Sequence, residues 1–233
     1  MSGLIDINFD FRRDTPEGKD PDTFSRTLRT YHKYLWSRPL PNGTLFTLDD
    51  TKPGVYLYHQ SDLGEFFLSS DSAINSFSKW KRMTHIINLL NRDELEEFRR
   101  LGYSMGGMII FPSNRVDGQH TINMARGVNK LISDRIDLTL ECIRRHYNGE
   151  SSPLAETLAL YAGFFSLFGS FQSYVQFFLL QDLVNETFST VKFFIPFDDF
   201  KTPAIPVTLT EYLAYKNKAI IFISARNQRI LKV

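Results

Sequence analysis

MARGVNKLISDRIDLTLECIRRHY, residues 124–147, carries apolar side chains at helical spacing. At about 3.6 residues per turn these side chains fall on one arc, and Arg135 lies inside it beside Leu131, Leu138 and Cys142. Arginine keeps its charge at any relevant pH, so a buried arginine requires an anion beside it. The stretch therefore predicts one amphipathic helix with a buried Arg135, whose partner is a carboxylate of the protein or a bound ligand.

The chain that follows this stretch also reads as mostly helical. Gly149 predicts the end of the first helix, and Ser152 with Pro153 predicts the start of the next one. Thr208 with Glu211 three residues later is typical of a capping box. A final amphipathic helix is therefore expected over Thr208–Leu231.

The segment between Glu156 and Asp182 has no charged residue and contains six phenylalanines, so its length alone would permit a membrane span. Serine and glutamine side chains interrupt it, and Gly163 and Gly169 favour breaks. The pattern therefore favours two short buried helices, with a break near Phe168–Ser170, over a transmembrane helix.

The first half combines strands and helices. Asp20 and Pro21 predict a helix start, because Asp is a favoured N-cap and Pro suits the first helical position. Further helices are expected over Ser76–Leu90 and Arg92–Leu101. Strands are expected over Leu4–Phe11, Thr44–Leu48, Val55–His59, Glu65–Leu68 and Met108–Phe111, with a late strand at Val191–Ile195; the third and fourth form a hairpin.

These elements predict an α+β fold. A small, mainly antiparallel sheet comes from the N-terminal half and is packed by helices, whereas the C-terminal half is mostly helical. We expect a single globular domain over residues 1–233, in which a mixed half of about residues 1–113 packs intimately on a helical half of about residues 114–233.

Composition narrows the class of function. A net charge of +1 argues against a general nucleic-acid binder, which needs a basic excess. The single cysteine, Cys142, excludes an intrachain disulfide and a multi-cysteine zinc site, and it fits a reducing compartment. The N-terminus lacks the basic and apolar regions of a signal peptide, so a cytoplasmic protein without membrane insertion is expected. The sequence leaves the oligomeric state open.

The phosphate-loop, dinucleotide-binding, zinc-protease and nucleophile-elbow motifs are all missing from the chain. Functional residue types are densest in the N-terminal loop and helix, Arg12–Ser37. Arg29, His32 and Trp36 share one helical stripe there, which predicts that Arg29 holds a phosphate or carboxylate and that His32 donates a proton. The alternative is a solvated helix face covered by Trp36.

A second group of candidates follows a predicted strand end, where open sheets place ligands and the N–H groups of the next helix attract anions. Plain turn and cap roles are the alternative for this group. With both groups combined, the predicted ligand-binding residues are Arg12, Arg13, Lys19, Arg29, Trp36, Asn114, Arg115, Asn123, Arg126 and Arg135. Asp20 and Asp22 would suit a hard cation. Asp20 already serves as an N-cap, so neither a metal nor a cofactor is expected.

Two further groups of charged residues read as solvated surface. Asp137, Glu141 and Arg145 are spaced i, i+4 and i+8, which indicates ion pairs along a wet helix face. Arg226 and Asn227 lie close to the C-terminus and indicate a solvated tail, with an inward-pointing Asn227 as the alternative.

The chain resembles a family of bacterial proteins that is classed as a domain of unknown function. The resembling stretches are GKDPDTFSRTLRTYHKYLWSRPLPNG (Gly18–Gly43), INMARGVNKLISDRIDLTLECIRRHYNGESSPL (Ile122–Leu154) and FFLLQDLV (Phe177–Val184). They span most of the chain. The resemblance implies a bacterial, cytosolic protein and lends no activity, substrate or structure.

Two hypotheses of function follow. In the first, a pocket lined by Arg29 and Arg135 binds an anionic small molecule, such as a nucleotide or another phosphate-bearing ligand, with His32 as the acid–base residue. In the second, the protein is a non-enzymatic interaction module with a protein or nucleic-acid partner, and the arginines form structural ion pairs. A shared pocket favours the first, and separate arginines paired to internal carboxylates favour the second.

Overall fold

The computed structural model describes residues 5–116 and 118–233. Its helices are α1 (Pro21–Phe24), α2 (Arg26–Trp36), α3 (Thr84–Ile87), α4 (Arg92–Gly102), α5 (Ile122–Val128), α6 (Ile136–Asn148), α7 (Ala155–Ala159), α8 (Ala162–Ser166), α9 (Phe171–Phe177) and α10 (Leu209–Ile230). Its strands are β1 (Leu57–Ser61), β2 (Gly64–Ser72) and β3 (Met108–Pro112). This composition confirms the predicted α+β class.

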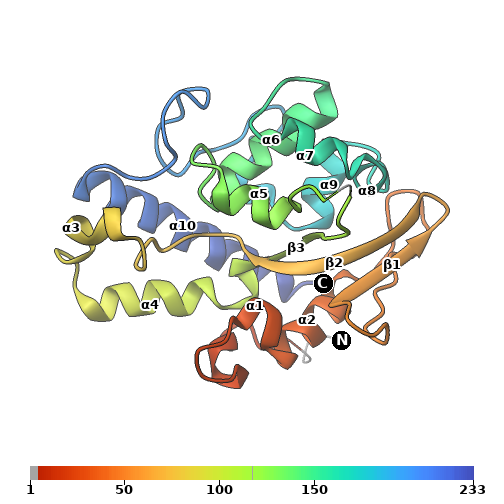
Figure 1. Ribbon diagram of the computed structural model, residues 1–233, viewed down its shortest axis with the longest axis horizontal. Coiled ribbons are helices and arrows are strands. Elements are labelled where there is room, and N and C mark those ends of the chain that lie inside the picture. The colour runs from red at the N-terminus through yellow and green to blue at the C-terminus, as the bar shows by residue number, and fades with distance from the viewer. Residues whose placement is uncertain (1–4, 117) are drawn as a thin grey trace.

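The strands form an antiparallel sheet in the order β1-β2-β3. The predicted hairpin is present, with Ser61 opposite Gly64 across a two-residue turn. In Figure 1, α5 to α9 lie above the sheet, α1 and α2 lie below it, and α10 runs behind it towards α3 and α4. Every residue of β3 is buried, because helices cover the strand.

One cluster of buried apolar side chains extends through both halves of the chain. Its centre is aromatic. The rings of Trp36, Phe46 and Phe168 each pack against the ring of Phe177, and Phe46 also packs against Phe168. The uncharged segment after Glu156 supplies much of this centre as three short helices, α7 to α9, with a break at 167–170. Among the described residues, no helix combines the length and the apolar character that crossing a membrane requires.

The single helix predicted over Met124–Tyr147 is wrong. The chain forms α5 and α6, separated by a turn in which Ser133 and Asp134 have φ angles of 50° and 59°. The Arg126 side chain stabilises this turn, since its Nη2 donates to the Asp134 carbonyl at 3.0 Å. Arg135 is therefore the N-cap residue of α6 and not an interior helix residue.

The predicted N-terminal strand is also wrong over its described part. Leu4 lies outside the described residues, and Ile5–Asp10 forms a turn in which the Asp6 carboxylate accepts from the Asn8 amide at 2.9 Å. Asp20 caps α1 as predicted, but the expected continuous helix breaks at Ser25. The Ser25 hydroxyl accepts from the Leu28 amide at 3.0 Å and caps the second helix, α2.

The other predicted elements divide between confirmed and wrong. The predicted helix at Arg92–Leu101, the strand at Met108–Phe111 and the capped C-terminal helix are confirmed as α4, β3 and α10. Thr44–Leu48 and Val191–Ile195 form only isolated bridges, because no neighbouring strand in the described chain continues their pairing. Ser76–Leu90 is helical only in the short α3 and the turn before it, since Phe77 adopts a left-handed φ of 56°.

Candidate functional site

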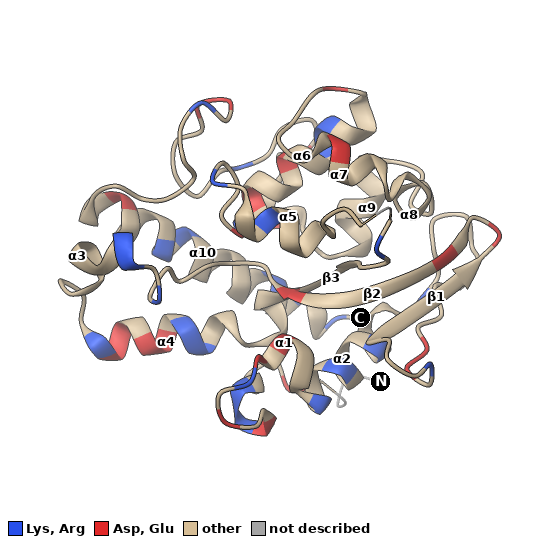
Figure 2. Ribbon diagram, viewed as in Figure 1, with Lys and Arg blue, Asp and Glu red and all other residues tan. Residues whose placement is uncertain are grey.

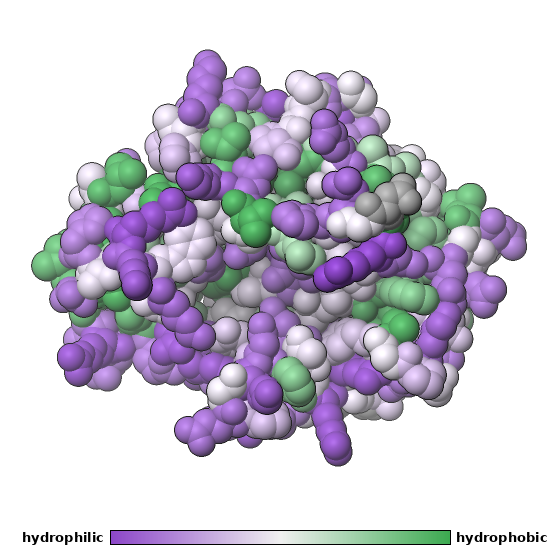
Figure 3. All heavy atoms as spheres, in the orientation of Figure 1, coloured by the Kyte–Doolittle hydropathy of each residue, from purple (hydrophilic) through white to green (hydrophobic). Residues whose placement is uncertain are grey.

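A cavity of about 260 Å³ opens where α1, the end of β2, the 74–80 segment and α4 meet. We call it the carboxylate cleft. Figure 3 shows the surface hollowed in this region, with hydrophilic side chains around the hollow. The residues that line the cleft are Asp20, Asp22, Asp71, Ser72, Ile74, Asn75, Ser76, Ser78, Lys79, Trp80, Phe98, Arg99, Gly102, Tyr103 and Asp134.

Local sequence rules place the carboxylates of the cleft. The Asp20 side chain caps α1 by accepting from the Asp22 amide at 3.1 Å, which fixes Asp22 in the first turn of that helix. Helix α1 packs against β2, whose last two residues are Asp71 and Ser72. Asp134 reaches the cleft from the left-handed turn before α6.

Arg126 connects the segments that carry Asp71 and Asp134, which form one wall of the cleft. Its side chain is fully buried and forms an ion pair with Asp71. Its Nε donates to the Thr139 hydroxyl at 2.9 Å, and its Nη2 donates to the carbonyls of Ser72 and Asp134 at 3.2 and 3.0 Å. One guanidinium group therefore joins β2, α6 and the turn before α6, so the positions of the carboxylates are fixed by protein contacts.

Asp22 is the least satisfied group in the cleft. Its Oδ1 is buried and has no hydrogen-bond donor among the described residues. Burial, together with the negative charges of Asp71 and Asp20, raises the pKa of Asp22 well above its usual range. A buried acceptor without a donor costs about 1–3 kcal/mol, so this side chain reduces the stability of the free protein.

The neighbouring carboxyl groups are shifted in the same direction. Burial raises the pKa of Asp71 to about 7, against the opposing effect of the Arg126 charge. Burial also raises the pKa of Asp134. A carboxyl group that titrates near neutral pH can both donate and accept a proton there, and such groups cluster at functional sites.

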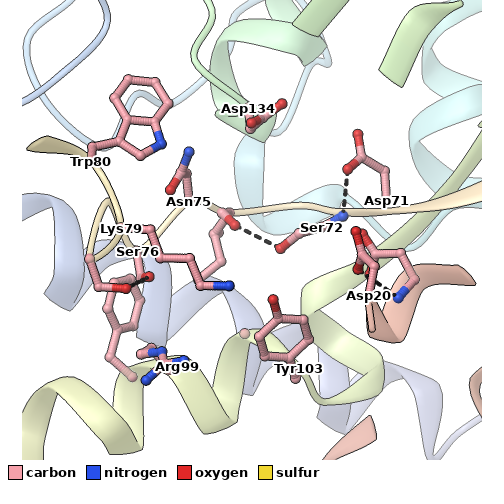
Figure 4. Close-up of a pocket in the computed structure, with 15 residues that line it drawn as sticks. Asp20, Asp71, Ser72, Asn75, Ser76, Lys79, Trp80, Arg99, Tyr103 and Asp134 are labelled. Carbon is pink, nitrogen blue, oxygen red and sulfur yellow. Dashed lines mark hydrogen bonds between the residues drawn. The ribbon is translucent and has the colours of Figure 1, made fainter. Parts of the chain in front are cut away.

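The opposite side of the cleft has a different character. Figure 4 shows the Lys79 ammonium and the Tyr103 hydroxyl pointing into the cavity, with Asp20 across from them and Asp71 above Asp20. Arg99 lies at the lower edge, where its Nη1 also donates to Glu96 at 2.9 Å. Trp80 adds a flat apolar surface above Lys79. The cleft therefore has carboxylates on one side and the Lys79 and Arg99 cations on the other. Figure 2 shows acidic residues on β2 and both acidic and basic residues along α4.

Within the part of the chain that the structure describes, no three His, Cys, Asp or Glu side chains are grouped so that they could hold a metal ion.

The prediction that Arg135 is buried and paired is confirmed. The side chain is 2% exposed, and its Nε and Nη2 donate to the Asp137 carboxylate at 3.1 and 2.5 Å. Its Nη1 donates to the Ala204 carbonyl at 2.9 Å. The guanidinium group borders a second, more apolar cavity of about 370 Å³ near Phe197 and Phe200.

Arg29 and His32 do not share a concavity with Arg135, so that prediction is wrong. Arg29 Nη2 donates to the backbone carbonyls of Asp50 and Val55 at 2.7 and 3.2 Å. His32 is fully buried and bonded to Ser70 and Trp36, and burial lowers its pKa to about 3. A neutral imidazole enclosed by protein has no access to substrate, which leaves the proposed proton-donor role without support.

Trp36 is likewise fully buried and does not cover a solvated face. Of the remaining N-terminal candidates, Arg12 pairs with Asp10 and Glu96, whereas Arg13 and Lys19 are exposed. The N-terminal loop packs onto the helix that follows it, since the Asp14 carboxylate accepts from the Ser25 hydroxyl at 2.6 Å and from the Thr27 amide at 2.8 Å.

The candidate residues that follow β3 mostly form hydrogen bonds within the protein or are exposed. Asn114 bonds to the backbone of Phe67 and Glu65, which continues the sheet edge, and Arg115 is exposed. Asn123 Nδ2 donates to the Ser70 carbonyl at 2.9 Å. Arg126 is the only predicted ligand-binding residue that contacts the wall of the carboxylate cleft through a described ion pair.

Two surface interpretations are wrong. The predicted ion pair between Glu141 and Arg145 forms at 2.8 Å, but Asp137 and Glu141 are buried and not on a wet face, because this stripe of α6 packs against the fold. Asp137 pairs with Arg135 instead. Arg226 and Asn227 are buried too, since α10 continues to Ile230 and packs against the segment before β3. Helical periodicity alone does not reveal a polar side chain that is buried with its partner.

Only part of the cleft has a signal in the sequence. Asp20 and Asp22 stand out through the helix cap, but Asp71, Asp134, Lys79 and Tyr103 lie in segments that carry no motif. A further signal is the run of polar residues Ser69, Ser70, Asp71 and Ser72 after the predicted strand Glu65–Leu68, because functional residues often lie where the chain leaves a rigid element.

The comparisons with known proteins give a family but no activity. Residues 5–230 match the model described as Family of unknown function (DUF6994). The chain belongs to this family. No curated protein and no solved structure matches it. The family assignment agrees with the resemblance described above, and the source organism remains a prediction.

Proposed function

We propose that this DUF6994 protein binds a small polar molecule in the carboxylate cleft, and that the molecule presents a positively charged group to Asp22 and Asp71. The observation that carries the proposal is the buried Asp22 Oδ1, which has no donor among the described residues and lies in the wall of a cavity. Buried polar groups are otherwise almost always hydrogen-bonded, so an acceptor of this kind at a cavity suits a donor from a ligand.

The opposite side of the cleft supports an anionic group on the same molecule. Lys79 points into the cavity, and Arg99 and Tyr103 add N–H and O–H donors at its edge. The anionic ligand that the sequence predicted at Arg29 and Arg135 is thus retained in the proposal, with Lys79 and Arg99 in their place. The class of ligand is a compact molecule that carries both an amine and a carboxylate or phosphate.

The size of the cavity limits this class. About 260 Å³ lies just below the range of about 300–1,000 Å³ that is typical of ligand pockets. This favours a molecule of amino-acid or amino-sugar size over a dinucleotide.

A thermal-shift screen tests the proposal with three sets of probes: amines such as putrescine, anions such as inorganic phosphate and malate, and molecules with both groups, such as amino acids, O-phosphoethanolamine and amino-sugar phosphates. The third set is expected to contain a ligand that stabilises by about 2.7 kcal/mol at a hundredfold excess over Kd. This corresponds to a rise in Tm of about 5–11 °C.

Two variants decide where such a ligand binds. Asp22→Asn should abolish most of the shift, whereas Asp62→Asn, which removes an exposed carboxylate from the β1–β2 turn, should keep it. An equal shift in both variants would place the ligand elsewhere. If all three sets fail, the interaction module becomes the better account, which the internal pairing of Arg135 with Asp137 already favours.

A further inference from the structure

Arg226 is a fully buried arginine without a carboxylate. Its side chain is 0% exposed, and no acidic side chain forms an ion pair with it among the described residues. The two other arginines buried to this degree differ in that respect, because Arg135 pairs with Asp137 and Arg126 pairs with Asp71. An uncompensated charge in a protein interior is unfavourable, so the surroundings of Arg226 require an explanation.

Backbone carbonyls compensate only part of this charge. Arg226 Nη1 donates to the carbonyls of Gly106 and Met108 at 3.0 and 2.6 Å, and Nε donates to the Phe178 carbonyl at 3.2 Å. These are dipoles and not charges. Arg226 Nη2 is buried and has no acceptor among the described residues.

Further unsatisfied donors lie around the same aromatic side chains. Arg38 places its guanidinium carbon 5.3 Å from the Trp36 ring centroid, and Arg226 lies 5.6 Å from that ring. Arg38 Nε and Nη2 are buried without acceptors in the described chain, and so is the hydroxyl of Tyr174, whose ring packs 4.8 Å from Phe178. The Phe178 ring in turn lies 5.2 Å from Trp36. Three donor side chains, from α9, α10 and the segment just after α2, thus border one group of aromatic rings, and none of them has an anionic partner among the described residues.

The charge of Arg38 acts on Arg226. Burial, with a further contribution from Arg38, lowers the pKa of Arg226 to about 9, and burial lowers the pKa of Arg38 to about 10. Both groups remain protonated at neutral pH. The interior beside Trp36 therefore carries two positive charges, and a single negative charge bound there would satisfy the free N–H groups and reduce the repulsion.

We propose that a small inorganic anion of the size of chloride binds beside Trp36, where it accepts hydrogen bonds from Arg226 Nη2, from Arg38 and from the Tyr174 hydroxyl. Arg38 is only partly buried and provides the route from solvent, whereas Arg226 forms the inner end of the site. This site is separate from the carboxylate cleft, because none of its donors lines that cavity. The anion would fasten the end of α2 to α9 and α10.

The test compares thermal unfolding in chloride, bromide and gluconate at equal ionic strength. Wild type is expected to gain about 3–6 °C in Tm at a tenfold excess of halide over Kd, since an anion that binds only the folded state stabilises it by mass action. Arg38→Met and Tyr174→Phe should reduce this halide-specific gain. Arg82→Met should keep it, because Arg82 is an exposed arginine stacked 4.4 Å from the other tryptophan, Trp80.

A crystal soaked in bromide gives the second measurement, and it does not depend on how well the variants fold. An anomalous peak within hydrogen-bond distance of Arg226 Nη2 is expected. A Tm that is the same in halide and gluconate, a halide effect that is unchanged in Arg38→Met, or a water molecule in place of the anomalous peak would each overturn the proposal.

Discussion

Replacing Arg135 with Ala should lower Tm by about 6–20 °C. The substitution leaves the Asp137 carboxylate, which is 0% exposed, without its cation in the protein interior. Removing one partner of a buried ion pair costs about 3–5 kcal/mol, and each kcal/mol shifts Tm by about 2–4 °C in a chain of this length. Thermal unfolding followed by circular dichroism measures the change.

The double variant Arg135→Met with Asp137→Asn is the control for this prediction. It removes both charges, while the new amide oxygen can still accept a hydrogen bond from the Phe194 amide, which the Asp137 carboxylate accepts at 2.9 Å in wild type. The double variant should recover a large part of the lost stability. An unchanged Tm in Arg135→Ala would show that the ion pair is not a structural requirement of α6.

Arg126→Met is the second substitution with a large expected effect. It removes the cation beside Asp71 together with the bonds to Thr139 and to the carbonyls of Ser72 and Asp134. A loss of about 3–5 kcal/mol is expected here too, and the carboxylate cleft should lose its ligand because its wall is no longer held in place.

The effects on stability and on ligand binding should differ in a double variant in which Asp71, the partner of Arg126, is also changed. Arg126→Met combined with Asp71→Asn should recover part of the Tm but none of the ligand-induced shift, since Asp71 belongs to the cleft itself. If Arg126→Met retains both the wild-type Tm and the ligand-induced shift, Arg126 does not organise the cleft.

The sequence predicted the chemistry of Arg135 correctly from an incorrect helix. The helical spacing of apolar residues continues across the 129–135 turn, because the residues on both sides of the turn pack into the same core. The spacing therefore does not show that the helix ends there. The burial of Arg135 was predictable, because it depends only on apolar neighbours. The break was not, since the Arg126 side chain that stabilises the turn acts through a tertiary contact.

The same distinction explains why the cleft was largely missed. Asp20 and Asp22 are recognisable through a local helix cap, which a single sequence shows. Asp71 and Asp134 reach the cleft only because β2, α1 and the turn before α6 pack together in the fold. Likewise, the helix around Arg226 was predicted, but its burial was not, because helical spacing does not show that this end of α10 packs against the segment before β3.

The central claim is that Asp22 binds a ligand and lowers the stability of the ligand-free protein. Thermal unfolding of the Asp22→Asn variant without ligand tests this claim most directly. A raised carboxyl pKa in the folded state means that the folded protein binds the proton more tightly than the unfolded chain. The cost of ionised Asp22 therefore grows as the pH rises above the ordinary range of aspartate. The Asp22→Asn substitution removes this charge while it keeps the shape of the side chain.

At about pH 8 the variant is predicted to unfold about 2–12 °C above wild type, which corresponds to the cost of about 1–3 kcal/mol for an unsatisfied buried acceptor. The advantage should shrink at about pH 5, because the raised pKa of Asp22 makes its ionised form less populated there than at pH 8. A variant that unfolds below wild type at both pH values would contradict the account, because Asp22 would then be a structural residue that holds α1 to the fold.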